Sequence, residues 1–328
     1  MEVLQNQELS LEDPDSAAEW DRFVGQNPWG TAFHTSAWLD VLQKEGFEVL
    51  RLTFKKEGNI VAVAPFCLLP WFHGLARVGV SLPRSDVGGP LIDPEMPESA
   101  FAPILAKSLQ RMLAKRVVSW SAAGLREPLR AMPGKPRPLR GFYPIINLND
   151  APPARIWSSV FTKRGNQRKD IRRIERDGLS TTMATKSDLL EFHSLYKLTV
   201  QRAGGNPYPY AFFETVWKTL KQNFRILLVK ESGRVVGGSG FLCFPERKLL
   251  HMSYCAYARD VMTRGSVNLY RFWKTIVWAN ENGYQTINAG TGDSRFKRQF
   301  GCGLVEKRAV RFVLLGRSSI SKNSETTL

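Results

Sequence analysis

The chain has 328 residues, more than a typical single domain, and its 43% of apolar residues is the share found in folded globular proteins. No stretch approaches the ~18 to 20 consecutive apolar residues that a membrane-spanning helix needs. The N-terminal region is acidic, unlike the basic start of a secretory signal. We therefore expect a cytoplasmic protein without a membrane span.

The charge balance favours anionic partners. Lys and Arg number 46 against 30 Asp and Glu, which gives a formal net charge of +16. Such a field attracts polyanions, including nucleic acids, nucleotide diphosphates and acidic lipid headgroups. The alternative, that the charge serves only solubility, stays open at this point.

The first half of the chain has the pattern of an α/β unit. Helices are expected at 16–26 and 37–44, the second after a Ser or Thr that can cap its N-terminus. A β-hairpin with strands 50–54 and 60–69 follows. The pattern then predicts a strand at 76–82, a helix at 97–116 and strands at 117–121 and 142–148. Repeated Pro and Gly residues predict irregular structure over 124–141, and a joint is expected near residue 150.

The second half repeats this order. A basic helix is expected at 156–177, ending at Gly178, and two more at 187–201 and 211–223. A hairpin at 224–231 and 234–244 precedes a strand at 249–257, a helix at 268–282 and a strand at 285–288. We predict an α/β (α+β) fold that duplicates one unit, with mixed, largely antiparallel sheets. The expected domains are 1–149 and 150–317, followed by a disordered tail, 318–328.

The loop at 81–93 is the first place where chemistry is expected. It holds two carboxylates, Asp86 and Asp93, together with Arg84. Either carboxylate could take part in a reaction, and Arg84 could bind a substrate. Asp is also a common turn former, so a purely structural role for Asp93 is the alternative.

The basic segment at 163–176 is the second place where chemistry is expected. Arg164 and Arg168 lie one turn apart near the expected helix start, where the helix dipole also favours anions. Like charges at this spacing cost helix stability, which suggests an anionic partner. A solvated face balanced by nearby acids is the alternative.

Two further segments could contact a substrate. The turn Gly290-Thr291-Gly292 precedes a basic segment with Lys297 and Arg298, an arrangement that suits an anion, although most such turns are structural. The loop at 204–210 presents Tyr208 and Tyr210, with prolines at 207 and 209. Tyr254, on an expected strand, could face the same cleft or pack in the core.

Several catalytic signatures are absent from the sequence. There is no Ser/His/Asp set, because His34, His73, His193 and His251 are dispersed. Neither zinc-site spacing nor a P-loop occurs, and the four cysteines lack C-x-x-C spacing, so no metal is expected. The pyrophosphate loop of acetyl-CoA transferases is only crudely approached by residues 234–239, which lie within an expected strand.

Four segments occur in a characteristic order: Pro83 to Asp93 with its Gly-Gly-Pro-x-x-Asp run, the Lys-Arg-rich segment 163–176, Tyr208-Pro209-Tyr210-Ala211-Phe212-Phe213, and Gly290-x-Gly followed by Phe296-Lys-x-x-Phe300-Gly. This order resembles the FemABX family and its relatives with tandem GNAT-like acyltransferase domains. The resemblance runs from about Trp20 to Phe312, nearly the whole chain.

The resemblance implies an N-acyltransferase that moves an activated acyl group onto an amine. The group is expected to be an aminoacyl group from aminoacyl-tRNA, and the acceptor a small-molecule, peptide or nucleotide-linked amine. Asp93 matches the family's candidate base, with Asp86 as an extra carboxylate. On this reading Lys297 and Arg298 would help to bind the acyl donor, and Arg164 and Arg168 would bind the anionic acceptor. In relatives that bind the acceptor's diphosphate, one ligand is a Lys of the first domain, and Lys44 is the nearest match to it.

Two alternatives remain at this point. The first is an acyl-CoA-dependent N-acyltransferase, with acyl-CoA in place of aminoacyl-tRNA as co-substrate. The second is a non-catalytic module that binds nucleic acid or another anionic surface. No bound cofactor is expected in any of the three cases.

Overall fold

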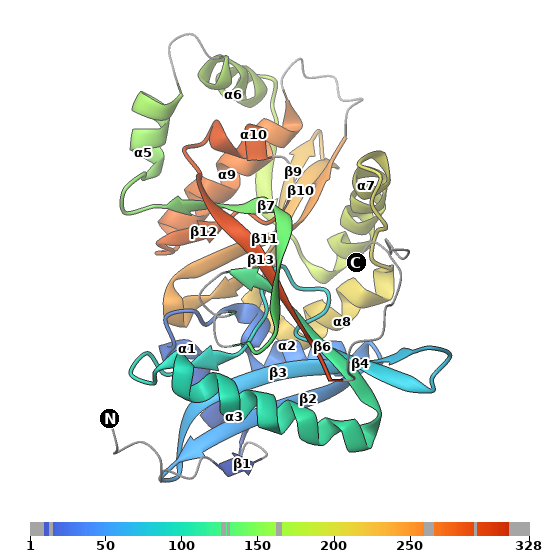
Figure 1. Ribbon diagram of the computed structural model, residues 1–328. Helices are drawn as coiled ribbons and strands as arrows, with labels where there is room; N and C mark the ends of the chain where they lie inside the picture. Colours follow the sequence, from blue (N-terminus) through green and yellow to red (C-terminus); the bar gives the residue numbers. More distant parts are fainter. Residues whose placement is uncertain are drawn as a thin grey trace.

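The computed structural model describes residues 10–12, 16–125, 129, 132–161, 166–258, 266–291 and 294–314 (Figure 1). The tail predicted to be disordered lies outside these residues. No helix in the described part is long and apolar enough to cross a membrane. The helices and strands form two α/β units joined by a single mixed sheet of 13 described strands.

The first unit contains α1 (Ala17–Gln26), α2 (Ser36–Lys44), β2 (Glu48–Lys56), β3 (Asn59–Trp71), β4 (Ala76–Val80), α3 (Glu98–Arg111) and β6 (Val117–Leu125), with the short β1 (Ser10–Glu12) and β5 (Leu91–Ile92). The cap predicted for the second helix is present, because the Thr35 side chain accepts a hydrogen bond from the backbone N–H of Trp38. The first helix has a cap that was not predicted: the Ser16 side chain accepts a hydrogen bond from the backbone N–H of Glu19. Each bond satisfies an N–H that the helix start leaves unpaired.

The second unit contains α7 (Leu189–Arg202), α8 (Tyr210–Leu220), β9 (Phe224–Glu231), β10 (Arg234–Phe244), β11 (Leu249–Tyr257), α9 (Val267–Glu281) and β12 (Thr286–Asn288). Two helices, a hairpin, a strand, a helix and a strand therefore occur in the same order in both units, as predicted. The hairpin turn at Ser232 and Gly233 has positive φ at both positions, which suits the twist of the paired strands.

The two units exchange one strand each. β7 (Lys135–Asn147) follows β6 in the chain but pairs with β12 of the second unit, and β13 (Gly303–Val313) follows β12 but pairs with β6 of the first. β7 and β13 also pair antiparallel with each other. In Figure 1 these two strands run side by side from one unit to the other. The boundary predicted near residue 150 stays a prediction, because strand pairing is continuous across the two units.

Two sequence expectations were wrong in detail. Irregular structure was predicted over 124–141, but β7 begins at Lys135 despite Pro136 and Pro138. The start of β7 pairs with β13, and among the described residues β12 pairs only with residues 145–147, so Pro136 and Pro138 have a strand on one side only, the kind of position where proline is tolerated. The helix predicted at 156–177 is instead α5 (Pro153–Arg155), a π-helical turn Ile156–Val160 and, after residues that are not described, α6 (Gln167–Arg176). β13 and β8 (Ser180–Met183) were not predicted.

The hydrophobic core continues from one unit to the other. One cluster of buried side chains includes Trp20 and Trp38 from the first unit and Phe212, Phe213 and Tyr254 from the second. Two further clusters fill the individual units. The shared cluster fixes the two units relative to each other, and the candidate site lies where they meet.

Candidate active site

The loop at 81–93 is fastened to the first unit at several points. The Ser81 hydroxyl donates to the carbonyl of Pro65 and accepts from the N–H of Gly89, both at 2.9 Å. The Trp38 indole donates to the Ser85 hydroxyl at 2.9 Å. These bonds fix the backbone on both sides of Asp86, so the loop holds this carboxylate in a defined place.

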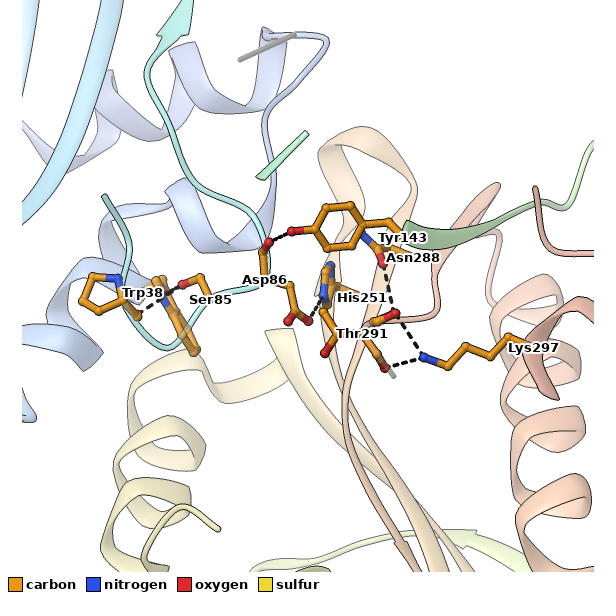
Figure 2. Close-up of polar contacts among 10 residues, drawn as sticks. Trp38, Ser85, Asp86, Tyr143, His251, Asn288, Thr291 and Lys297 are labelled. Carbon is orange, nitrogen blue, oxygen red and sulfur yellow. Dashed lines mark hydrogen bonds and ion pairs between the residues drawn. The ribbon is translucent and has the colours of Figure 1, made fainter. Parts of the chain in front are cut away.

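Asp86 faces the second unit. Its carboxylate oxygen Oδ2 lies 2.8 Å from Nε2 of His251 on β11 (Figure 2). The Tyr143 hydroxyl, on the exchanged strand β7, donates to the backbone carbonyl of Asp86. The His251 side chain is 2% exposed and that of Asp86 is 23% exposed. The carboxylate is therefore held by the second unit, and part of the Asp86 side chain remains exposed.

Gly290 lies beside Asp86, in the turn that follows β12. Its φ is +69°, and a Cβ at this position would lie 2.2 Å from the carbonyl of Met252 and 3.7 Å from Oδ2 of Asp86. Its N–H donates to Oδ1 of Asn288 at 3.0 Å, and Asn288 lies opposite His251 in the β11–β12 pairing. A side chain would not fit here, which explains the glycine of the sequence motif.

Lys297 approaches the same turn from α10 (Ser294–Arg298). Its ammonium donates to the carbonyls of Gly290 at 3.0 Å and Thr291 at 2.5 Å (Figure 2). An ammonium has three donors, so these two bonds leave one without a partner among the described residues. The residue is only 9% exposed.

Charges at the site perturb one another. Burial opposes ionisation of Asp86, but the hydrogen bond and charge of His251, with the charges of Lys307 and Lys297, hold its pKa below the usual 3.8. Burial lowers the pKa of Lys297 from 10.5 to about 8, although Asp86 acts in the opposite direction. At neutral pH the site therefore presents a carboxylate and an ammonium in one partly buried place.

Arg84 joins the two units beside this site. Its guanidinium lies over the rings of Tyr208 at 5.0 Å, Phe212 at 5.4 Å and Phe47 at 5.7 Å, and 3.5 Å from the carboxylate of Glu45. The buried Nε atom has no hydrogen-bond partner among the described residues. The structure thus brings Arg84 and Tyr208 together in a cationic aromatic wall that a substrate could contact.

The other predicted tyrosines lie differently. Tyr254 is 4% exposed and packs among Tyr196, Phe213 and Phe212, which favours the core-packing alternative. Tyr210 packs its ring against His193 at 5.5 Å rather than against Arg84. Their predicted contact with a substrate stays a prediction.

Asp93 has a turn geometry. Its side chain accepts a hydrogen bond from the N–H of Glu95 at 2.9 Å, as Asp residues commonly do in turns, and its own N–H donates to the carbonyl of Val61. Its catalytic role stays a prediction. Of the two carboxylates in the loop, Asp86 has the partners across the site.

The basic segment provides surface charge beside the site. Arg164 lies outside the described residues. Arg168 donates to the carbonyl of Phe161 at 2.6 Å, so part of its guanidinium holds the preceding turn. Gln167 of α6 contacts Gln299 just after α10, so the two helices are neighbours. A larger set of exposed cations lies on these two helices: Lys169, Arg172, Arg176, Arg295 and Arg298.

Sequence reasoning missed three residues of this site: His251, Tyr143 and Asn288. The histidines were described as dispersed, yet His251 meets a carboxylate 165 residues away. No sequence spacing signals that contact. Lys44, the candidate for binding a diphosphate, donates to the Thr219 hydroxyl of α8 at 3.0 Å. Within the described residues no group of three or more His, Cys, Asp or Glu side chains could hold a metal ion.

Comparisons with known proteins agree with this architecture. Residues 162–298 match the family model of the GNAT acetyltransferase domain. The fold is similar to the crystal structure of FemX, with a TM-score of 0.72 and 14% identity over 92% of this chain and 96% of that chain. No curated protein matches the sequence at a significant level.

Two further solved structures share the fold. L-PGS from Bacillus licheniformis has a TM-score of 0.61 and 16% identity, over 94% of each chain. A tandem GNAT protein from the clavulanic acid biosynthesis pathway has a TM-score of 0.56 and 12% identity, over 95% of this chain and 100% of that one. At these identities the similarities establish the fold, including its two GNAT-like units.

Proposed function

We propose that this chain, whose residues 162–298 match the GNAT acetyltransferase domain and whose fold is similar to that of FemX, is an acyltransferase that moves an aminoacyl group from aminoacyl-tRNA to an amine. The observation that carries the proposal is that Asp86 and Lys297 both lie at Gly290, where the two units meet: Oδ2 of Asp86 is 3.7 Å from the Cβ position of Gly290, and Lys297 donates to its carbonyl. This arrangement offers one negative and one positive group to a reacting ester.

The reaction needs no covalent nucleophile. The amine attacks the ester carbonyl, a C–N bond forms, and the C–O bond to the terminal ribose of the tRNA breaks. In the tetrahedral intermediate the former carbonyl oxygen is negative and the attacking nitrogen is positive. A proton then passes from that nitrogen to the departing ribose oxygen, which leaves as a hydroxyl.

The two charged groups match the two charges of this intermediate. The remaining donor of Lys297 stabilises the oxyanion, and the carboxylate of Asp86 stabilises the developing positive charge on nitrogen. The low pKa of Asp86 makes it a poor proton acceptor but keeps it ionised, so its role is to orient the amine. His251 and Tyr143 fix its position.

The exposed cations of α6 and α10 favour tRNA as the donor. Arg172, Arg176 and Arg298 lie on neighbouring helices, and Lys297 belongs to the second of them. A polyanion bound along this surface would place its end near the Lys297 ammonium. A further solved structure of similar fold is described as the C-terminal domain of a "Putative Lysylphosphatidylglycerol Synthetase" from Agrobacterium fabrum, a name that specifies a lysyl product. Arg84 and Tyr208 then face the acceptor.

Acyl-CoA is the alternative donor, since the matched family model is that of an acetyltransferase domain. CoA carries few phosphates, so its binding depends weakly on salt, whereas tRNA binding depends steeply on it. This difference separates the two donors in one assay.

The test incubates the protein with a mixture of aminoacyl-tRNAs or with an acyl-CoA panel, each with a panel of amines, and identifies amide products by mass spectrometry. We expect products from aminoacyl-tRNA, abolished by prior ribonuclease treatment, and much reduced in Asp86→Asn and Lys297→Met. Products from acyl-CoA alone would overturn the choice of donor. Full turnover in both variants would overturn the assigned chemistry.

A further inference from the structure

The hairpin between β3 and β4 ends in exposed apolar side chains. The turn is Trp71-Phe72-His73-Gly74-Leu75, and in Figure 1 the hairpin extends outward from the first unit. Trp71, Phe72 and Leu75 are 41%, 62% and 63% exposed. We call these three residues the apolar tip. Their exposure keeps a large apolar area in water, which costs free energy unless something covers it.

An apolar turn is not a general feature of the hairpins in this chain. The β2–β3 turn is Lys56-Glu57-Gly58-Asn59, and the β9–β10 turn is Ser232-Gly233. Both consist of polar residues and glycine, the usual composition of tight turns. The apolar tip therefore departs from the pattern that folding alone favours.

The backbone of the tip is held in an unusual conformation. Phe72 and His73 have φ of +48° and +52°, values that β-carbon sterics make costly for residues other than Gly and Asn. The turn is closed by its own hydrogen bonds, from the N–H of Gly74 to the carbonyl of Trp71 and from Leu75 to Phe72. The conformation points to a role for the aromatic residues outside folding.

Positive charge flanks the tip. The N–H of Arg77, which pairs with Pro70 next to the turn of the hairpin, donates to the carbonyl of Arg116, which brings the end of α3 and its following turn beside the hairpin. That segment presents Leu113, 40% exposed, and the exposed cations Arg111, Lys115 and Arg116. We call these three cations the basic flank. The nearby acid Glu48 is already paired with Arg77 at 2.7 Å.

We propose that the apolar tip inserts into the surface of an anionic lipid bilayer while the basic flank binds the lipid headgroups. Trp is enriched at the membrane interface, Phe and Leu favour burial at the boundary between headgroups and acyl chains, and Lys and Arg near that surface add attraction to anionic lipids. A protein partner fits less well, because a stable protein interface needs about 800 Å² per partner, more than three side chains on a narrow turn provide.

The test measures binding to sedimented vesicles made of equal parts phosphatidylglycerol and phosphatidylcholine, or of phosphatidylcholine alone. The parent should bind the anionic vesicles, and less as salt rises. The triple variant Trp71→Ser, Phe72→Ser, Leu75→Ser should bind about ten-fold or more weakly. The matched control, Leu190→Ser with Leu198→Ser, removes two comparably exposed leucines from α7 and should bind like the parent.

A second pair of variants tests the charges. Lys115→Gln with Arg116→Gln should weaken binding to anionic vesicles by about five-fold per charge, with Lys197→Gln and Lys218→Gln as controls on other helices. Insertion of the tip should shift the tryptophan emission of the parent to shorter wavelength on vesicles, and Trp71→Phe should lose much of that shift while still binding.

Three outcomes would overturn the proposal. One is no binding of the parent to anionic vesicles. Another is equal binding by the triple serine variant, provided its circular dichroism shows that it is folded. The third is a parent that is dimeric by light scattering and becomes monomeric in the triple variant, which would assign the tip to contact between copies of this chain.

Discussion

Asp86 and His251 are 165 residues apart in the sequence, yet their side chains form a contact of 2.8 Å between the two units. The contact places a carboxylate of the first unit beside Gly290 of the second unit, whose carbonyl accepts a hydrogen bond from Lys297. Neither unit alone contains both charges. The site therefore depends on the relative position of the units, and predictions can be made for each of its parts.

The two carboxylates of the loop should differ in importance. Asp86→Asn removes the negative charge that stabilises the attacking nitrogen, and kcat should fall about 10²- to 10³-fold. Asp93→Asn keeps the turn bond from Glu95 and should change kcat little. Steady-state kinetics with aminoacyl-tRNA measure both. A larger loss in Asp93→Asn, at unchanged thermal stability, would return the catalytic role to Asp93.

Deprotonation of Lys297 should lower the activity at alkaline pH. Its pKa of about 8 means that the ammonium loses its proton as pH rises through 8, and the oxyanion then loses its donor. We expect kcat/KM to fall above that pH. Lys297→Arg keeps its charge, so its profile should lose this limb even if its activity is lower, while Lys297→Met should be weakly active throughout. An unchanged limb in Lys297→Arg would assign it to the acceptor amine instead.

Gly290 should tolerate no side chain. Gly290→Ala adds the strain of a positive φ, about 1 to 2 kcal/mol, and a clash with the carbonyl of Met252. The matched control is Gly233→Ala, where φ is +84° but no atom lies within 4 Å of the new Cβ. Thermal unfolding should show a clearly larger loss for Gly290→Ala. Equal losses would mean that the turn relaxes and that close packing at the site is not required.

The cations of α6 should act through a polyanion. Lys169→Gln with Arg176→Gln should raise KM for aminoacyl-tRNA and lower the slope of log KM against log salt concentration by about 1 per lost phosphate contact. Lys218→Gln with Lys221→Gln, on and after α8, is the control. If KM and its salt dependence are unchanged in the α6 variant, tRNA does not bind along this helix.

The fold followed from the sequence where the pattern is local. Turn residues marked the hairpins at Lys56–Asn59 and Ser232–Gly233, and Thr35 marked the start of α2. The strand β13 escaped prediction, because its partners β6 and β7 lie far away in the sequence and its own pattern is mixed: it is exposed at Glu306 and buried at Val310. Pairing between strands that are far apart in the sequence leaves no periodic pattern of apolar residues from which the strand could be predicted locally.

The site was predicted in part for the same reason. Asp86, Arg84, Tyr208 and Lys297 stood out because each lies in a segment of unusual local composition. His251 lies in an ordinary strand, and only its neighbour across the sheet gives it significance. The order of motifs signalled the fold but did not specify which carboxylate faces the second unit.

The exchange of β7 and β13 has a consequence for synthesis of the chain. The first unit cannot complete its side of the sheet until β13, near the C-terminal end, has left the ribosome. Until then β6 offers an unpaired edge to other chains. Because pairing across this separation is slow, folding should finish only after translation, and the nascent protein should depend on chaperones more than a chain with two sequentially closed domains.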